Sequence, residues 1–307
     1  MNFYNPNKAN IYKRKTNLSD QFTEITFGSK ILKDKTSEKI LEANTLWNNT
    51  VLGGFLKTNI DFKELQEIID WFNDYLKSIV NTKTELGLFI ASTINENEIS
   101  KSDVVSILKK ADFNISDIVI EEKEEKIPDA LIEFLKKQVR EESDAFKDLV
   151  EKRKMTFFKT EFEHTVNGIK YTLPIENESE GTKRYYGFAG LLAFLIKKPT
   201  ILPIDELEAS LHPDLYLHFI LSFLLNSKTS QIVATTHNRE ILDNKDIFRN
   251  DAIWFTDKQE SSSTELYSLA DFDSSVIRNT TNVFNAYKSG KLNGTPNLGD
   301  TFIDLNP

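Results

Sequence analysis

The chain of 307 residues contains no cysteine. This absence excludes disulfide bonds, zinc sites with thiolate ligands and a cysteine nucleophile. No apolar run approaches the roughly 18 residues that a membrane span requires. The first residues, 1–6, also lack the features of a secretory signal peptide. We therefore expect a cytoplasmic protein that has no membrane partner.

Positive charge is also scarce, because 38 lysine and arginine residues stand against 47 aspartate and glutamate residues, for a net charge of −9. Nucleic-acid-binding proteins usually carry a basic surface, so charge does not indicate nucleic acid as a partner, although a local basic groove is compatible with it. The balance of 39% hydrophobic and 28% charged residues is typical of a folded globular protein and not of a disordered chain. The length allows one large domain or two smaller ones.

A short apolar run at residues 200–204 ends in two adjacent carboxylates, Asp205 and Glu206. The run has the length of a buried strand, and α/β proteins place their chemistry at the ends of such strands. Magnesium prefers oxygen ligands and keeps several waters, so Asp205 alone would hold the ion. Glu206 would orient or deprotonate an attacking water. A solvated strand end carries the same residue types, so other segments must support this interpretation.

Residues 179–184, Ser-Glu-Gly-Thr-Lys-Arg, precede a long apolar segment and indicate the start of a helix. Exposed backbone N–H groups and the helix dipole favour an anion at such a place. Lys183 and Arg184 would lie in the first turn, where positive charge disfavours the helix unless a phosphate is bound. The alternative is an ordinary surface helix that Ser179 caps.

His237 follows a β-branched run at residues 231–236 that predicts the next strand. The order helix, strand, helix, strand over residues 185–236 is typical of parallel βα units. A parallel neighbour would bring His237 close to Asp205 and Glu206, where its imidazole would contact a γ-phosphate. The alternative is a histidine at the end of a strand whose hydrogen bonds are satisfied and which has only a structural role.

These segments together resemble the ABC-type ATPases of the SMC/RecF/OLD kind, in particular bacterial AAA family ATPases of phage-defence loci. The matching segments are the signature loop at 179–184, the Walker B residues Asp205 and Glu206, the Ser-Leu-His-Pro turn of the D-loop region at 210–213, and the switch at 235–238. The resemblance is specific over residues 155–300 and vaguer before them.

The resemblance implies ATP and Mg²⁺ as cofactors and a dimer that sandwiches the nucleotide, in which Ser179 and Gly181 of one subunit cover ATP held by the other. It implies catalytic roles for Glu206 and His237 and a metal-binding role for Asp205. The implied nucleotide contacts are Ser179, Gly181, Thr182, Lys183 and Ser210.

The implied fold class is α/β, with the C-terminal lobe of a P-loop NTPase, its parallel strands and a helical arm insertion. We expect three parts: an N-terminal remnant of the ATPase core at residues 1–60, a mainly helical arm or lid at 61–154, and the ATPase lobe at 155–307. Within the arm, helices are expected from Asp61 and Ser102 and, from Pro128 to Lys154, over Val139 and Phe146. A charged, solvated stretch is expected at residues 121–126.

The chain departs from the family in lacking the motif Gly-x-x-x-x-Gly-Lys-Ser/Thr, which cradles the β- and γ-phosphates. Its only Gly-Lys pair, Gly290-Lys291, is followed by a leucine. We expect a truncated or split gene product that works as a homodimer or with a P-loop-bearing partner, and that acts with a defence effector. Pro203 within the Walker B strand and Glu180 in the signature loop are smaller departures.

Two other functions stay open from the sequence. The first is a non-catalytic interaction or regulatory module that keeps the ATPase fold but does not hydrolyse ATP. The second alternative is a metal-dependent hydrolase, although its candidate ligands lack the i, i+4 histidine pair of a helical zinc site. Those candidates are Glu208, His212, Asp214 and His218.

Overall fold

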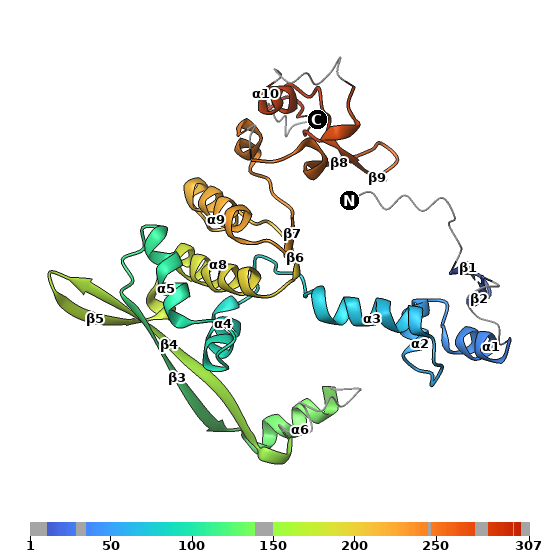
Figure 1. Cartoon of the computed structure of the whole chain (residues 1–307), viewed down its shortest axis with the longest axis horizontal. Helices are drawn as coiled ribbons and strands as arrows, with labels where there is room; N and C mark the ends of the chain where they lie inside the picture. The colour runs from blue at the N-terminus through green and yellow to red at the C-terminus, as the bar shows by residue number, and fades with distance from the viewer. Residues whose placement is uncertain are drawn as a thin grey trace, which may run out of the picture. The chain divides into compact units, whose positions relative to one another are not determined.

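The computed structural model describes residues 11–28, 35–138, 150–244, 247–273, 282–296 and 298–301. The chain divides into two compact units, Met1–Lys77 and Ser78–Pro307. Both units combine helices and strands, so the chain has a mixed α/β fold, as the sequence predicts (Figure 1). The three-part division stays a prediction. No helix in the described ranges is both long enough and apolar enough to cross a bilayer.

The first unit consists of an antiparallel hairpin and three helices. Its elements are β1 (Tyr12–Asn17), β2 (Phe22–Phe27), α1 (Lys35–Asn44), α2 (Val51–Phe55) and α3 (Lys63–Tyr75). Alternation along β2 buries Thr23 and Ile25 on one face. The helix α3 begins one residue later than the sequence predicts, because its N-cap is Phe62 and not Asp61. A Cβ on Gly54 would lie 2.1 Å from the Thr45 hydroxyl, so this glycine does allow a close approach of α1 and α2.

The core of the second unit is built around α8 (Glu180–Lys197), of which nearly every residue from Thr182 to Leu195 is buried. The helices α4 (Leu86–Asn95), α5 (Lys101–Lys110) and α9 (Pro213–Asn226) pack against it (Figure 1). A Cβ on Gly190 would lie 2.3 Å from Cδ1 of Ile90, so this glycine sets how closely α4 approaches α8. Because α8 is packed within this core, its N-terminal turn lies on a rigid element.

The strands β6 (Ile201–Ile204) and β7 (Gln231–Ala234) are parallel, which confirms the parallel βα arrangement. Val80 extends this sheet by one bridge on the other side of β6, where its N–H donates to Pro203 O at 3.0 Å and its carbonyl accepts from Asp205 N–H at 2.8 Å. Backbone groups of a parallel strand alternate between its two neighbours. The N–H that Pro203 lacks would therefore face the Val80 side, so the proline removes no bond from the β6–β7 ladder.

An antiparallel sheet of three strands lies before α8 in the chain, with β4 between β3 and β5. Its elements are β3 (Asp117–Lys126), α6 (Asp129–Gln138), β4 (Lys154–Val166), β5 (Ile169–Pro174) and the 3₁₀ helix η1 (Ile175–Asn177). Positive φ angles of 52° at Asn167 and 78° at Gly168 fit a type I′ turn, for which Asn-Gly is a favoured sequence.

The charged stretch at 121–126 is mostly exposed, as expected, and it also forms the second half of β3. Cross-strand pairs such as Glu124 with Lys154 at 2.6 Å stabilise it against β4. The described parts of the predicted long helix are α6 and the helical residues 150–152, so the helix ends two residues before Lys154, where β4 begins. Val139 and Phe146 lie outside the described residues.

The C-terminal part forms a small cluster around an antiparallel hairpin. Its elements are η2 (Arg239–Asp243), η3 (Asn250–Ala252), β8 (Trp254–Lys258), β9 (Thr264–Ser268), η4 (Leu269–Asp271) and α10 (Val283–Lys288). Phe255, Leu269, Ala286 and Leu292 form its core. The described residues after Ser289 form turns and irregular structure.

Candidate functional site

The two carboxylates lie in the turn that directly follows β6, and the end of β7 holds that turn. The Thr235 hydroxyl donates to Asp205 Oδ1 at 2.6 Å and accepts the N–H of Glu206 at 2.9 Å. The backbone of Thr235 also bonds to both sides of the turn, donating to Ile204 O and accepting from Leu207 N–H. The side chain of Thr235, the residue that follows β7, therefore holds both the Asp205 carboxylate and the backbone of Glu206.

Glu206 adopts a left-handed backbone conformation, with φ at 49°, and Ser210 does so as well, with φ at 62°. For a residue with a Cβ this conformation costs roughly 1–2 kcal/mol. Such strain persists only where surrounding contacts hold it, and it concentrates at functional sites. The bond from Glu206 N–H to Thr235 is one of the contacts that holds it here.

His237 lies beside the carboxylate turn. Its Nε2 is 3.7 Å from Glu206 Oε1, and the two side chains are 87% and 44% exposed. The backbone N–H of His237 donates to Glu208 Oε1 at 2.6 Å. The structure thus gathers Asp205, Glu206 and His237 at the C-terminal ends of two parallel strands, with the imidazole open to solvent.

Ser179 is the N-cap of α8, and its hydroxyl accepts the N–H of Thr182 at 3.1 Å. Gly181 lies against the D-loop region, because a Cβ there would come within 3.1 Å of Ser210 O. Lys183 forms an ion pair with Glu180 at 2.9 Å along the helix surface. The start of α8 therefore presents its N-terminal turn next to Ser210, and Lys183 has a carboxylate partner within its own turn.

Arg184 lies near the start of α8, as the sequence predicts, but its side chain does not face solvent. It is buried, its Nη1 donates to Asn81 O at 3.0 Å, and its guanidinium lies 4.7 Å from the centre of the Phe188 ring. Burial lowers the pKa of Arg184. Because Val80 bonds to Asp205 N–H, Arg184 connects α8 through residues 80–81 to the carboxylate turn.

The ligands suggested for a metal-dependent hydrolase do not meet. His212 caps α9, where its Nδ1 accepts the N–H of Asp214 at 3.3 Å, and His218 Nδ1 bonds to the Tyr185 hydroxyl at 2.7 Å. Glu208 bonds to the backbone of the switch instead. The described residues, which include all four candidates, contain no group of three or more histidine, aspartate or glutamate side chains that could hold a metal ion. The hydrolase alternative therefore has no structural support.

The residues present fit Mg²⁺ and part of a nucleotide. Asp205 and Glu206 offer oxygen ligands at a partly exposed turn, which suits an ion that keeps several waters. The exposed N-cap of α8 suits an anionic group. The loop that would cradle the β- and γ-phosphates is not in this sequence.

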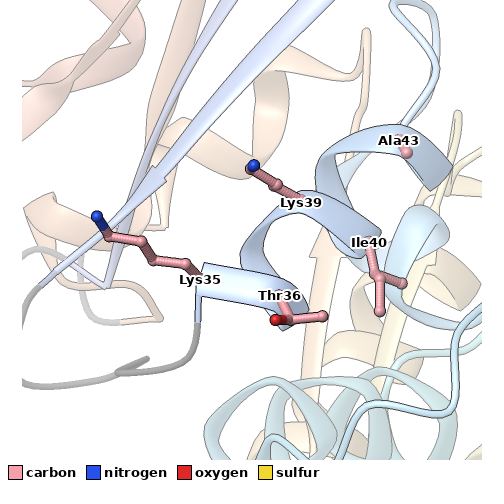
Figure 2. A pocket seen from close by; sticks show the side chains of 5 residues that line it. All are labelled: Lys35, Thr36, Lys39, Ile40 and Ala43. Carbon is pink, nitrogen blue, oxygen red and sulfur yellow. The ribbon is translucent and has the colours of Figure 1, made fainter.

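A hollow in the first unit has different chemistry. It lies along one face of α1 and is lined by Lys35, Thr36, Lys39, Ile40 and Ala43 (Figure 2). Figure 2 shows the two lysine side chains extending from the helix, and the lining includes no carboxylate. This hollow therefore lacks the carboxylates and the histidine that lie around Asp205.

Sequence reasoning missed Thr235, Arg184 and Glu208 in the roles that the structure gives them. Thr235 belongs to a run of β-branched residues that predicts a strand and nothing more. Its function depends on the register that pairs Ile204 with Ala234, which places residue 235 opposite the carboxylate turn. A strand-pairing register is the signal that would have found it.

A comparison with family models matches residues 56–243, more than half of the chain, to the family described as "AAA domain, putative AbiEii toxin, Type IV TA system". The matched range contains the α8 N-terminus, both carboxylates and His237. A search of curated proteins found no match. The family is one of ATPases, whose members generally bind ATP with Mg²⁺. The chain belongs to this family of AAA-domain proteins.

Proposed function

We propose that the chain is the ATP-hydrolysing lobe of an ABC-type ATPase of the SMC/RecF/OLD kind, which acts in the cytoplasm as a dimer or with a P-loop-bearing chain. The observation that carries this proposal is the junction of β6 and β7. There one hydroxyl, that of Thr235, bonds to Asp205 and to the backbone of Glu206, and His237 lies 3.7 Å from Glu206. Membership of the AAA family supports nucleotide as the ligand.

Each residue of the junction has a chemical role in this proposal. When bound, Mg²⁺ neutralises phosphate charge and orients the nucleotide. Asp205 would hold the ion, and the Thr235 hydroxyl fixes the orientation of that carboxylate. Glu206 would accept a proton from the attacking water. His237 would contact the terminal phosphate, since its exposed imidazole lies next to Glu206.

The nucleotide contacts of the opposite subunit would come from the start of α8. Ser179, Gly181 and Thr182 supply backbone N–H groups and hydroxyls there, and the close approach of Gly181 to Ser210 makes the two loops one surface. Lys183 would have to exchange its partner Glu180 for a phosphate. That exchange is easy, because an i, i+3 ion pair on a helix surface contributes only about 0.2–0.5 kcal/mol, and the Glu180 side chain is 79% exposed.

An unpaired strand edge supports the need for a P-loop-bearing partner. Among the residues that the structure describes, β7 pairs only with β6, and its Val233 is 56% exposed. A parallel strand that leads into a phosphate-binding loop would pair with the backbone of this edge, and the helix after that loop would cover Val233. The wording of the family description, which names a toxin of toxin–antitoxin systems, supports a role in defence or toxin control with an effector.

Calorimetry with Mg-ATP tests the proposal. The chain alone should bind with a Kd well above micromolar. Binding should tighten at least tenfold with a P-loop-bearing chain, either the polypeptide encoded beside this one or the P-loop segment of an intact family member. Asp205→Asn should weaken binding of the Mg²⁺ complex in the pair, and Asp61→Asn serves as a control at an exposed aspartate of the first unit. Tight binding to the isolated chain, or no gain from the P-loop chain, would contradict the proposal.

A further inference from the structure

We propose that Glu208 is a positioning residue, which sets the place of His237 beside Glu206 by holding the backbone of residue 237. The proposal deepens the proposed function, on which only its kinetic test rests. The sequence offered Glu208 as a metal ligand, but the structure directs it to the end of β7.

The bond between Glu208 and His237 is short and charge-assisted. The distance from His237 N to Glu208 Oε1 is 2.6 Å, below the usual range for an N–H···O bond. Bonds to an ionised carboxylate are shorter and stronger than those between neutral groups. Glu208 follows Glu206 by two residues. The same loop therefore carries Glu206, the proposed general base, and Glu208, which accepts the backbone N–H of His237.

The second carboxylate oxygen, Oε2 of Glu208, is buried and has no hydrogen-bond partner in the described part of the chain. A buried polar atom without a partner costs free energy, so such atoms in native proteins call for an explanation. Stability alone does not provide one, since an apolar side chain of similar size would avoid that cost. A carboxylate placed to accept the His237 N–H does provide one.

Thr235 is bonded to the carboxylate turn, but few contacts restrain the chain after it. His237 is exposed, and its imidazole has solvent around it apart from Glu206. Asn238 N–H donates back to the Thr236 hydroxyl at 3.0 Å, a local bond that does not fix residue 237 to another element. In the part of the chain that the structure describes, the bond from its N–H to Glu208 is therefore what joins the backbone of residue 237 to the loop after β6.

Tyr216 on α9 supports this arrangement from a third element. Burial raises the pKa of Tyr216, a hydrogen bond with the Thr236 side chain lowers it, and the nearby charge of Glu208 raises it again. The hydrogen bond places the Tyr216 hydroxyl at the segment that follows β7, within range of the charge of Glu208. The anchor is thus part of a small cluster and not an isolated surface contact.

Residue-resolved hydrogen exchange of the full chain tests the anchor without nucleotide. The amide of His237 should be protected although it is exposed, and Glu208→Ala should speed its exchange by about tenfold or more, as expected for a lost charge-assisted hydrogen bond. Glu208→Gln keeps the length and an accepting oxygen and should retain most of the protection. Glu208→Asp keeps the charge but is too short and should lose it. Glu240→Ala removes an exposed carboxylate from the same segment and should change nothing at residue 237.

Kinetics in the complex with a P-loop-bearing chain test the consequence. Glu208→Ala should lower kcat about tenfold with KM unchanged, and Glu208→Gln should restore most of the loss. Full protection of the His237 amide in Glu208→Ala, or an unchanged kcat in that variant, would overturn the inference. A wild-type complex that does not hydrolyse ATP would refute the proposed function, and the exchange measurement would then decide the role of Glu208 by itself.

Discussion

Replacing Thr235 with valine keeps the shape of the side chain and removes the hydroxyl that joins the two carboxylate residues. Two hydrogen bonds are lost, one to the Asp205 carboxylate at 2.6 Å and one from the Glu206 N–H at 2.9 Å. A net hydrogen bond contributes about 0.5–1.5 kcal/mol, and one to a charged group up to about 3 kcal/mol. Because both bonds are exposed to solvent, the lower values apply and the expected loss is about 1–2 kcal/mol.

For a unit of this size, about 1 kcal/mol changes Tm by roughly 2–4 °C, so Thr235→Val should lower Tm by about 2–8 °C. The Glu206 amide should also exchange faster, because its left-handed backbone loses a contact that holds it. Thr256→Val is a matched control, since Thr256 is an exposed strand threonine for which the described residues show no side-chain hydrogen bond. Differential scanning fluorimetry and hydrogen exchange give both readouts. An unchanged Tm together with unchanged protection of Glu206 would refute the reasoning.

Three further predictions concern the second unit. Gly190→Ala should destabilise the protein by about 1–3 kcal/mol in chemical denaturation, because its Cβ would overlap Ile90, and Ile90→Val should recover part of the loss. Burial raises the pKa of Tyr185 to about 12, so its roughly 3 kcal/mol contribution to stability is complete below pH 10 and is lost as pH rises towards 12. The difference in tyrosinate absorbance between wild type and Tyr185→Phe should therefore appear together with unfolding and not before it. The isolated chain should self-associate through the edge of β7, and Val233→Lys should reduce this in light scattering, whereas a monodisperse wild-type monomer would contradict it.

The sequence predicts those elements whose own pattern is complete. Phe22–Phe27 alternates over its full length, and the structure has β2 over the same residues. The apolar segment after Ser179 likewise predicts α8, and the cap lies at the expected serine. In both cases the local periodicity and the tertiary environment favour the same element, so nothing overrides the pattern.

Other elements depend on partners that the local sequence does not show. The helix α4 at Leu86–Asn95 has no clear polar face, because α8 covers several of its residues, so its periodicity is weak. β3 continues through a run of charged residues because β4 pairs with each of them. Val80 joins the sheet by one bridge, too short to show any alternation.

For the site, the sequence identifies the residue types but not the contacts between them. The adjacent acids Asp205 and Glu206 and a histidine after the next strand are visible as a pattern. Their roles as metal ligand, base and phosphate contact remain predictions. The hydroxyl of Thr235 and the bond from Glu208 to His237 follow from strand register and from side-chain conformations, which no spacing rule encodes.

Turnover of Mg-ATP by the chain together with a P-loop-bearing partner tests the central claim most directly when Glu206→Gln is compared with wild type. The amide keeps the size and hydrogen bonding of the carboxylate but cannot accept a proton from water. The account predicts that Glu206→Gln abolishes hydrolysis while Mg-ATP still binds and the complex still assembles, and that the exposed control Glu260→Gln hydrolyses at the wild-type rate. Hydrolysis by Glu206→Gln at the wild-type rate would contradict it.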